Sequence, residues 1–355
     1  MRILITGICG FVGQVLARTL PEYLPGVEII GLDNFIRAGS EQNRATLARQ
    51  GIKFFHADIR AASDFELLPA VDWVIDAAAN ASVLAGIDGR AGSRQLVEHN
   101  LGGTVNILEY CKRHRAGFIL LSTSRVYSIR ALASLEMETV SRAFRPRAEQ
   151  LWPTGCSPEG VTEQFPTDAP LSLYGSTKLA SEILAMEYGS AFEFPVRINR
   201  CGVLAGAGQF GRADQGIFSF WIHSYARRRA LKFIGFGGTG HQVRDCFEPR
   251  DLAPLLTRQM NNRERLVEPP INIGGGARNS MSLRQLSDWC ADRFGAHPIQ
   301  SDPNPRPFDI PWMVMDGQPA EARWDWRPQT SLETILVEIA EHAEKHPLWL
   351  DASTA

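Results

Sequence analysis

The sequence predicts an α/β protein in which a doubly wound parallel sheet carries a smaller mixed α/β lobe at its C-terminal side. Two observations support this. The first 125 or so residues alternate short apolar runs with helical patterns, and continuously apolar strands are typical of a sheet covered by helices on both faces. The length of 355 residues suits two domains. We expect a larger domain over residues 1–200 and a smaller lobe over 201–355, with some chain exchange between them.

The elements follow from the pattern of apolar residues. Six strands of the larger domain are expected at Arg2–Thr6, Val27–Leu32, Lys53–His56, Trp73–Ala78, Gly117–Ser122 and Val196–Asn199. Its helices are expected at Phe11–Leu20, Asn100–His114 and Tyr174–Tyr188. The smaller lobe should contain a strand at Leu231–Ile234 and helices near Ile217–Ala230, Leu252–Met260 and Ser282–Phe294. Residues 128–170, rich in Arg, Glu, Ala and Pro, contain no clear strand and are interpreted as an insertion or a lid-like excursion.

Composition excludes several classes of function. The formal net charge of −2 provides no overall field to hold nucleic acid or an anionic membrane, and no run approaches 18 uninterrupted apolar residues. The six cysteines stand singly, without a CxxC pair or a metal-ligand cluster. Reduced thiols in a cytoplasmic protein are therefore expected, with no bound metal, nucleic acid or membrane partner.

A glycine-rich turn follows the first expected strand. Gly7, Gly10 and Gly13 have the spacing G-x-x-G-x-x-G between a strand and a helix. Gly7 permits the tight turn, Gly10 lets the backbone approach a pyrophosphate, and Gly13 lets the helix pack closely on the sheet. The N-terminus of the helix offers unpaired N–H groups to phosphates. The spacing therefore predicts a Rossmann-type dinucleotide-binding domain.

Two acidic residues end the next strands. Asp33 follows Gly13 by 20 residues, where a carboxylate accepts hydrogen bonds from ribose hydroxyls and repels the additional phosphate of NADP. Asp58, at the end of the third expected strand, is positioned to meet the adenine edge. We therefore predict NAD as the cofactor, although Arg37 lies close enough to Asp33 to leave NADP open.

A tyrosine and a lysine stand four residues apart at the start of a helix. Tyr174 and Lys178 form a Y-x-x-x-K pattern, so the phenol and the ammonium should lie on one helical face and meet the same cavity. The fifth expected strand ends in the hydroxyl residues Ser122, Thr123 and Ser124. Ligands of doubly wound sheets bind at the carboxyl ends of strands, so these residues should surround the same site.

With T-G-x-x-G-F-x-G at Thr6–Gly13, Thr123 ahead of a Val-Tyr pair, and Y-x-x-x-K at Tyr174–Lys178, the chain resembles the extended short-chain dehydrogenase/reductase family. The resemblance implies that Tyr174 is the base, that Lys178 holds the nicotinamide ribose, and that Thr123 hydrogen-bonds the reacting oxygen. The implied cofactor contacts are Gly7, Gly10, Phe11, Val12, Gly13, Asp33, Asn34, Asp58, Ile59, Ala77, Ala78, Ala79, Asn100, Tyr174 and Lys178.

The chemistry of such a site depends on the pKa of one phenol. A free tyrosine has a pKa of about 10 and is a poor base at neutral pH. A lysine cation and a positive nicotinamide ring within a few ångströms would favour the phenolate. We expect Tyr174 to take the proton of a sugar hydroxyl while the sugar carbon is oxidised by NAD.

The second half of the chain carries further matches, and these imply a nucleotide-linked sugar as substrate. Arg244, in a Val-Arg-Asp unit, would meet the diphosphate, since a guanidinium is a planar fork of permanent charge; a structural salt bridge with Asp245 or Glu248 is the alternative. Within the family the likeness is closest to the CDP-tyvelose (CDP-paratose) 2-epimerase group, which implies a CDP- or UDP-linked sugar. The substrate contacts expected are Ser124, Arg125, Asn199, Gln209, Gln215 and Arg244.

Several activities remain open. An epimerase oxidises a sugar carbon transiently and returns the hydride, whereas a dehydratase places an acidic pair directly after the catalytic threonine, where this chain has Ser124 and Arg125. A nucleotide-sugar dehydrogenase or ketoreductase would use the same Tyr, Lys and Thr. A non-catalytic NAD-sensing protein would often keep the glycines and lose the Tyr-Lys pair. The family also implies a homodimer, formed by the helices near Asn100–His114 and Tyr174–Tyr188.

Overall fold

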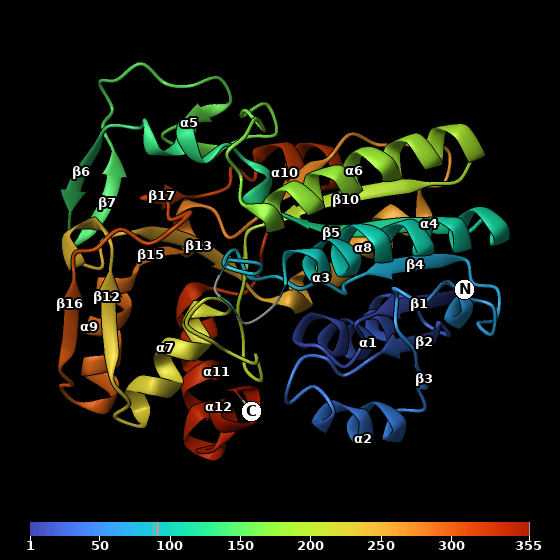
Figure 1. The fold of residues 1–355 in the computed structure, drawn as a ribbon, viewed down its shortest axis with the longest axis horizontal. Coiled ribbons are helices and arrows are strands. Elements are labelled where there is room, and N and C mark those ends of the chain that lie inside the picture. Colours follow the sequence, from blue (N-terminus) through green and yellow to red (C-terminus); the bar gives the residue numbers. More distant parts are fainter. Residues whose placement is uncertain (88, 90–91, 355) are drawn as a thin grey trace.

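Seven parallel strands form the central sheet of the computed structural model, which describes residues 1–87, 89 and 92–354. The strand order is β14-β10-β5-β4-β1-β2-β3 (Figure 1). The chain reverses direction along the sheet between β1 and β4, which is the switch point where doubly wound folds bind ligands. The strands are β1 (Arg2–Thr6), β2 (Glu28–Asp33), β3 (Lys53–His56), β4 (Trp73–Asp76), β5 (Gly117–Thr123), β10 (Val196–Cys201) and β14 (Ile271–Ile273).

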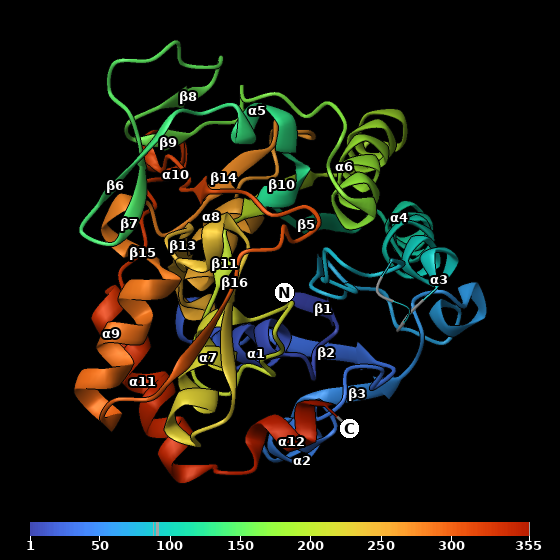
Figure 2. The same cartoon turned by 60° about the vertical axis from the view of Figure 1, so that its left-hand side comes forward.

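Helices cover both faces of this sheet, because successive side chains of each strand point to opposite sides. Ile3 and Ile5 belong to the core on one face, and Leu4 belongs to the core on the other. The first face is covered by α1 (Phe11–Tyr23), α8 (Leu252–Asn261) and α10 (Gln318–Trp324), and the second by α3 (Ser93–Val97), α4 (Gly103–His114) and α6 (Leu173–Phe192) (Figure 2). The short helix α2 (Gln42–Arg49) follows β2 at the sheet edge.

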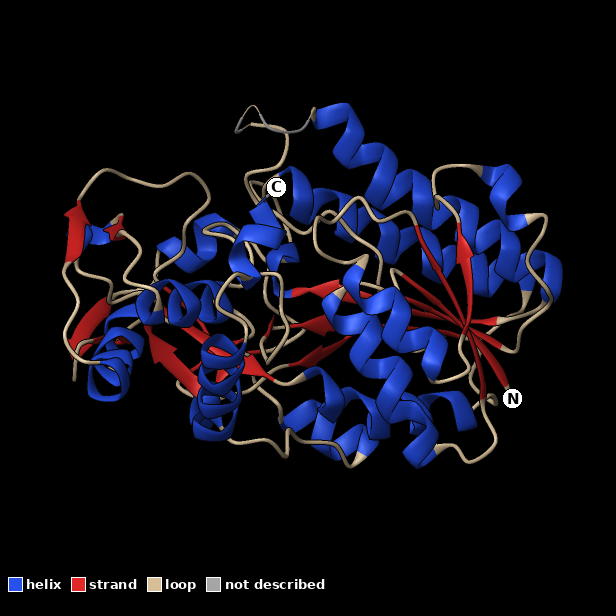
Figure 3. Ribbon diagram, turned by 90° about the horizontal axis from the view of Figure 1, so that it is seen from below, coloured by secondary structure: helices blue, strands red, loops and turns tan. Residues whose placement is uncertain are grey.

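The smaller lobe is built on short mixed strands (Figure 3). Its main sheet joins β11 (Val203–Leu204), β13 (Val243–Phe247), β15 (Ser280–Ser282) and β17 (Trp312–Met313), and a second pair joins β12 (Leu231–Ile234) to β16 (Ile299–Asp302). Four helices pack with them: α7 (Ile217–Ala226), α9 (Leu283–Phe294), α11 (Leu332–Lys345) and α12 (Trp349–Thr354).

The insertion at residues 128–170 differs from its prediction in two respects. It contains the helix α5 (Ile129–Ala133) and two hairpins, β6 (Met137–Val140) with β7 (Ala143–Pro146) and β8 (Cys156–Ser157) with β9 (Gly160–Val161), where no clear strand was expected. Its apolar side chains, including Leu132 and Phe165, pack against Trp312 and Met315 of the smaller lobe. None of its described residues lines the main cavity, so it is a packed extension of that lobe rather than a lid over the cavity.

The predicted fold class is confirmed, and the further differences are shifted element boundaries and one unpredicted strand. Strand β10 runs on to Cys201, and helix α7 ends at Ala226 rather than Ala230. The helix expected to begin at Asn100 is preceded by a π-turn at Glu98–Gly102 and by α3, so helical structure starts at Ser93. The seventh strand, β14, was not predicted, because its three residues give too short an apolar run. In the described part of the chain, every helix is too short or too polar to span a lipid bilayer.

Candidate active site

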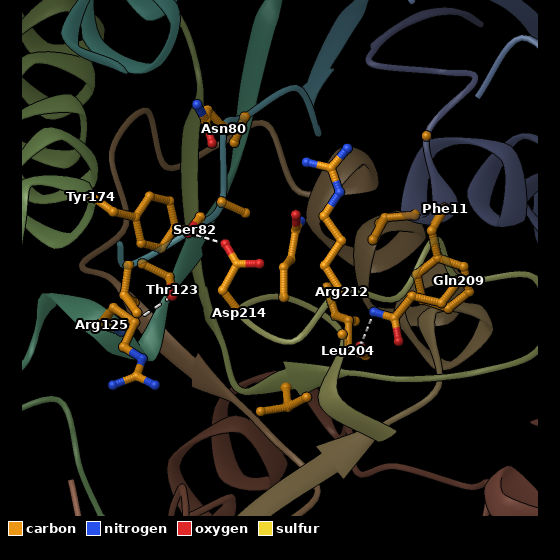
Figure 4. A pocket seen from close by; sticks show the side chains of 18 of the residues that line it. Phe11, Asn80, Ser82, Thr123, Arg125, Tyr174, Leu204, Gln209, Arg212 and Asp214 are labelled. Atoms are coloured by element: carbon orange, nitrogen blue, oxygen red, sulfur yellow. Dashed lines mark hydrogen bonds between the residues drawn. The ribbon is translucent and has the colours of Figure 1, made fainter. Parts of the chain in front are cut away.

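A cavity of about 640 Å³ opens at the carboxyl ends of β1, β4, β5 and β10, between the two lobes. Figure 4 shows Tyr174, Thr123 and Arg125 on one side of this cavity and Phe11 and Gln209 on the other. The following predicted residues line it: Gly7, Gly10, Phe11, Val12, Gly13, Asp33, Asn34, Ile59, Ala77, Ala78, Ala79, Thr123, Ser124, Arg125, Tyr174, Gln209, Gln215 and Arg244. Asp58, Asn100, Lys178 and Asn199 are not among the lining residues.

The glycine-rich turn has the close approaches that its sequence predicts. Gly7 has a φ of +63°, and a Cβ there would lie 2.9 Å from the Cα of Ala78. A Cβ on Gly13 would lie 2.3 Å from the carbonyl oxygen of Gly7. A side chain at either position would collide with backbone, so the turn keeps its shape only with glycine. The result is a backbone-walled cradle at the N-terminus of α1, which suits a pyrophosphate.

The Asp33 carboxylate is fixed beside this turn. It accepts hydrogen bonds from the backbone N–H of Cys9 at 2.9 Å and of Phe35 at 2.8 Å. Burial raises the pKa of Asp33, whereas the backbone hydrogen bonds lower it. Arg37, which had left NADP open, donates to Gln215 Oε1 at 2.7 Å and to the carbonyl oxygen of Phe210. Its guanidinium is therefore engaged within the protein.

Asp58 and Asn100 stand behind the cavity wall. Asp58 accepts hydrogen bonds from Arg60 and from Asn34 Nδ2, which is itself a lining residue. Asn100 accepts from the backbone N–H of Asn80 at 2.9 Å and donates to its carbonyl oxygen at 3.1 Å. Both side chains therefore support residues that line the cavity and do not line it themselves.

The side chains of Tyr174 and Thr123 lie next to each other on the wall of the cavity. Ser172 caps α6 by accepting from the backbone N–H of Gly175 at 3.1 Å. A Cβ on Gly175 would lie 2.2 Å from the carbonyl oxygen of Arg125, so glycine lets the start of α6 approach the end of β5. This approach brings the phenol of Tyr174 within hydrogen-bonding reach of the hydroxyl of Thr123.

The positive charge that lowers the pKa of Tyr174 comes from Arg125, whereas the sequence predicted Lys178. Burial raises the pKa of Tyr174 to about 12, while the hydrogen bond with Thr123 and the positive charge of Arg125 lower it. Lys178 is 2% exposed and was expected to supply that charge. Burial lowers the pKa of Lys178, and the negative charges of Asp76 and Glu182 raise it. Its ammonium thus faces two carboxylates inside the protein.

A buried polar network lies directly behind these residues. Arg200 donates to both carboxylate oxygens of Glu182, with a shortest distance of 2.7 Å. Ser122 also donates to Glu182, and Arg200 Nη1 lies 3.3 Å from the hydroxyl of Tyr127. The network ties α6, which carries Tyr174, to the two strands β5 and β10.

Asn199, predicted as a substrate contact, does not line the cavity. Its amide exchanges two hydrogen bonds with the amide of Gln259 on α8, at 3.0 and 2.8 Å, and it is fully buried. The reason is the true length of β10, which continues for two residues beyond Asn199. Cys201 and Gly202 therefore reach the edge of the sheet and line the cavity instead.

Three arginines surround one end of the cavity. Arg244 donates to Asp309 Oδ1 at 3.0 Å, so neither Asp245 nor Glu248 is its partner. Arg125 donates to the carbonyl oxygen of Phe308 at 3.3 Å, and its pKa is lowered to about 10 by burial and by Arg244. Arg306 also lines the cavity. Of the three arginines, Arg244 forms the printed ion pair with Asp309, so this end carries excess positive charge that can neutralise a diphosphate.

Sequence reasoning missed several lining residues, namely Ser82, Arg212, Asp214, Gln242, Arg306 and Asp309. These residues lie in loops or short strands of the second half, or in the loop after β4, where no periodic pattern identifies a cavity wall. Gln242 stands two residues before Arg244, and Asp214 directly precedes Gln215. For Gln242 and Asp214, this nearness to predicted contacts was the one signal in the sequence.

Comparisons with known proteins agree with this arrangement. The NAD dependent epimerase/dehydratase family matches residues 3–274. The chain is similar to CDP-paratose 2-epimerase of Salmonella typhi, with 28% identity over 349 residues, covering 93% of this chain and 96% of the relative. It is also similar to UDP-glucuronate 4-epimerase of Thermodesulfobacterium geofontis, with 26% identity over 351 residues and coverage of 94% and 93%.

A solved structure gives the same fold. The UDP-glucuronic acid 4-epimerase of Bacillus cereus, in complex with UDP-glucuronic acid and NAD, superposes with a TM-score of 0.77. The alignment covers 97% of this chain and 99% of that chain at 23% sequence identity. At this identity the likeness establishes the shared fold.

Proposed function

Because this chain belongs to the NAD-dependent epimerase/dehydratase family, an extended short-chain dehydrogenase/reductase type of enzyme with NAD as cofactor, we propose that it inverts one carbon of a nucleotide-linked sugar. The observation that carries the proposal is the Tyr174–Thr123 pair, which faces a cavity with a glycine cradle and an arginine cluster. The cradle suits one diphosphate and the arginines suit another. A site that holds a dinucleotide and a nucleotide sugar needs both.

The residues present fit the cofactor. The Gly7–Gly13 turn leaves its backbone bare, and Asp33 is held by backbone N–H groups at the end of β2. The engaged guanidinium of Arg37 and the carboxylate of Asp33 both favour NAD over NADP. When bound, NAD supplies the reversible oxidation of a sugar carbon.

The protein side chains act on the proton and the oxygen of the reacting sugar hydroxyl. Tyr174 takes the proton of the sugar hydroxyl during oxidation and returns it during reduction, while Thr123 donates a hydrogen bond to the same oxygen. Arg125 favours the phenolate form of Tyr174. Lys178, whose ammonium lies near the negative charges of Asp76 and Glu182, would hold the nicotinamide ribose.

An epimerase is favoured over a dehydratase by the residues that follow Thr123. Elimination of a hydroxyl requires an acid to protonate the leaving oxygen. Ser124 and Arg125 stand at these positions, and neither is an acid at neutral pH. The likeness to CDP-paratose 2-epimerase favours a CDP-linked sugar and inversion at carbon 2.

The test is a panel of CDP- and UDP-linked hexoses incubated with the purified protein in deuterated water and followed by NMR. We expect one sugar to give its epimer with protium retained at the inverted carbon and no NADH released. Deuterium entering the product would contradict internal hydride return. Stoichiometric release of NADH would instead identify a dehydrogenase, and loss of water a dehydratase.

Replacing Arg125 by glutamine should alter the pH dependence of this activity. Removing the positive charge makes the phenolate of Tyr174 less favourable, so the pKa of Tyr174 rises. The rising limb of kcat/KM against pH is then expected to move to higher pH by about one unit, within the range of single-charge effects. Arg125→Lys, which keeps the charge, is the control. An unmoved limb accompanied by a higher KM would show that Arg125 acts in binding alone.

We also propose that the enzyme is a cytoplasmic homodimer. All six cysteines are free and buried, as expected in a reducing compartment.

Ile183 and Phe192 on α6 and Val97 on α3 are 51%, 41% and 41% exposed, which gives that helical layer an apolar outer surface. Light scattering should report a dimer, and Ile183→Arg should give a monomer. Leu67→Arg, at a position 83% exposed outside these helices, is the matched control; a wild-type monomer would contradict the proposal.

A further inference from the structure

We infer that Asp214 is a specificity-determining residue that accepts a hydrogen bond from a hydroxyl of the substrate's sugar. This inference rests on the proposed function, since it assumes that a nucleotide sugar occupies the cavity. Asp214 lies in the segment between β11 and α7, and Ser82 lies in the loop after β4. Both residues line the cavity that contains Tyr174 and Thr123.

The hydroxyl of Ser82 fixes one oxygen of the carboxylate. Ser82 Oγ accepts a hydrogen bond from the backbone N–H of Leu84 at 3.2 Å and donates its proton to Asp214 Oδ2. A serine hydroxyl has one proton, so its donor capacity is fully used by Asp214. The contact joins residues 132 positions apart and bridges the two lobes. Oδ2 is thereby oriented by the protein itself.

The second oxygen of the carboxylate lacks a partner. Asp214 Oδ1 is buried and receives no hydrogen bond from any described residue of the chain. A buried carboxylate oxygen without a donor carries a desolvation penalty that a hydrogen bond normally offsets. Because the residue lines a cavity, the missing donor is expected to come from a ligand in that cavity.

The segment that carries Asp214 is held in place by hydrogen bonds from three arginines of the cavity wall. Arg306 donates to the carbonyl oxygen of Ala213 at 3.2 Å, and Arg37 donates to Phe210 and Gln215 on either side. Arg212 Nε donates to the carbonyl oxygen of Ser353 in the C-terminal helix at 2.9 Å. These anchors hold the carboxylate in place, so its free oxygen acts as a preorganised acceptor.

The negative charge of Asp214 favours a sugar hydroxyl as the donor of the missing hydrogen bond. The carboxylate repels a diphosphate, whose binding is instead favoured by the arginine cluster. In Figure 4 the carboxylate of Asp214 and its partner Ser82 lie between Arg212 and the Tyr174–Thr123 side. The ligand group expected beside Tyr174 and Thr123 is the sugar, whose hydroxyls are neutral donors. The same charge disfavours a sugar that carries a carboxylate at this position.

The experiment measures the binding of three ligands to wild-type enzyme and to Asp214→Ala by calorimetry. The ligands are the nucleotide sugar that the wild type converts, the corresponding free nucleoside diphosphate, and NAD. We expect Asp214→Ala to weaken binding of the nucleotide sugar by about 10-fold to 100-fold. Affinities for the free diphosphate and for NAD should change by less than about 2-fold. Asp292→Ala, an exposed position on α9, is the matched control.

Deoxy analogues of the sugar make the assignment specific. One deoxy analogue should lose affinity for the wild type by the same factor and should bind Asp214→Ala no more weakly than the parent sugar does. Equal losses for the nucleotide sugar and the free diphosphate would overturn the inference, as would a selective loss of NAD. Ser82→Ala provides a second readout and should lower sugar affinity by a smaller factor. Failure of the wild type to bind or convert any nucleotide sugar would refute the proposed function itself.

Discussion

Tyr174→Phe is expected to lower kcat by about 10²-fold to 10⁴-fold, the usual contribution of a positioned general base. The substitution removes only the phenolic oxygen that hydrogen-bonds with Thr123 and leaves the ring in its buried position. Binding should therefore change little. Turnover of the nucleotide sugar is measured by NMR, and the cofactor content is measured after denaturing the purified protein.

Tyr188→Phe is the control for this prediction. It is the same substitution on the same helix, but the Tyr188 hydroxyl lies at the surface, where it donates to Glu109 Oε1 at 2.8 Å. We expect wild-type turnover and cofactor content for this variant. Full turnover by Tyr174→Phe would remove the basis for the proposed reaction. Loss of bound NAD from Tyr174→Phe would instead indicate that the phenol supports cofactor binding.

Glu182→Ala is expected to lower the free energy of unfolding by about 3–5 kcal/mol, the typical loss when one partner of a buried ion pair is removed. The side chains of Glu182 and Arg200 are 1% and 8% exposed. Without the carboxylate, the guanidinium of Arg200 stays buried, and among the described residues Tyr127 is its remaining side-chain hydrogen-bond partner. Ser122 loses its acceptor as well. Urea unfolding followed by fluorescence and by circular dichroism measures the difference.

An exposed ion pair gives the comparison for this loss. Arg293 and Glu344 lie 3.0 Å apart, with side chains 30% and 50% exposed. Glu344→Ala should lower the free energy of unfolding by less than about 1 kcal/mol, because solvent screens the pair. Similar losses for the two variants would show that the Glu182 network contributes no more than a surface contact.

The larger domain could be predicted closely because its elements follow local periodicity. The buried strand at Trp73–Asp76 was predicted from its run of apolar residues, and the helix at Leu173–Phe192 from its helical pattern. Prediction failed for strands that are too short to show a period. The hairpin strands of residues 128–170 pair locally but span two to four residues each, and the three-residue strand β14 pairs with the distant strand β10.

The residues of the site could also be predicted where they belong to local motifs, and were misjudged where the folded structure decides their surroundings. The glycine turn, Asp33, Thr123 and Tyr174 all line the cavity, and the sequence pointed to them because each belongs to a local motif with a fixed relation to a strand end or a helix start. Asn199 was wrongly placed because β10 is two residues longer than its apolar run suggested. Lys178 follows Tyr174 by one helical turn, but its side chain is buried and does not line the cavity.

The sequence alone determined the parallel sheet, the glycine-rich turn and the place of Tyr174 at the start of a helix, because spacing along one strand or helix specifies them. The tertiary structure alone decided which charges surround them. Arg125, Arg244, Arg306 and Asp309 come together from three separate segments, and Ser82 meets Asp214 across 132 positions. Such contacts arise only when the two lobes pack together, since no local periodicity encodes which loops will share a cavity.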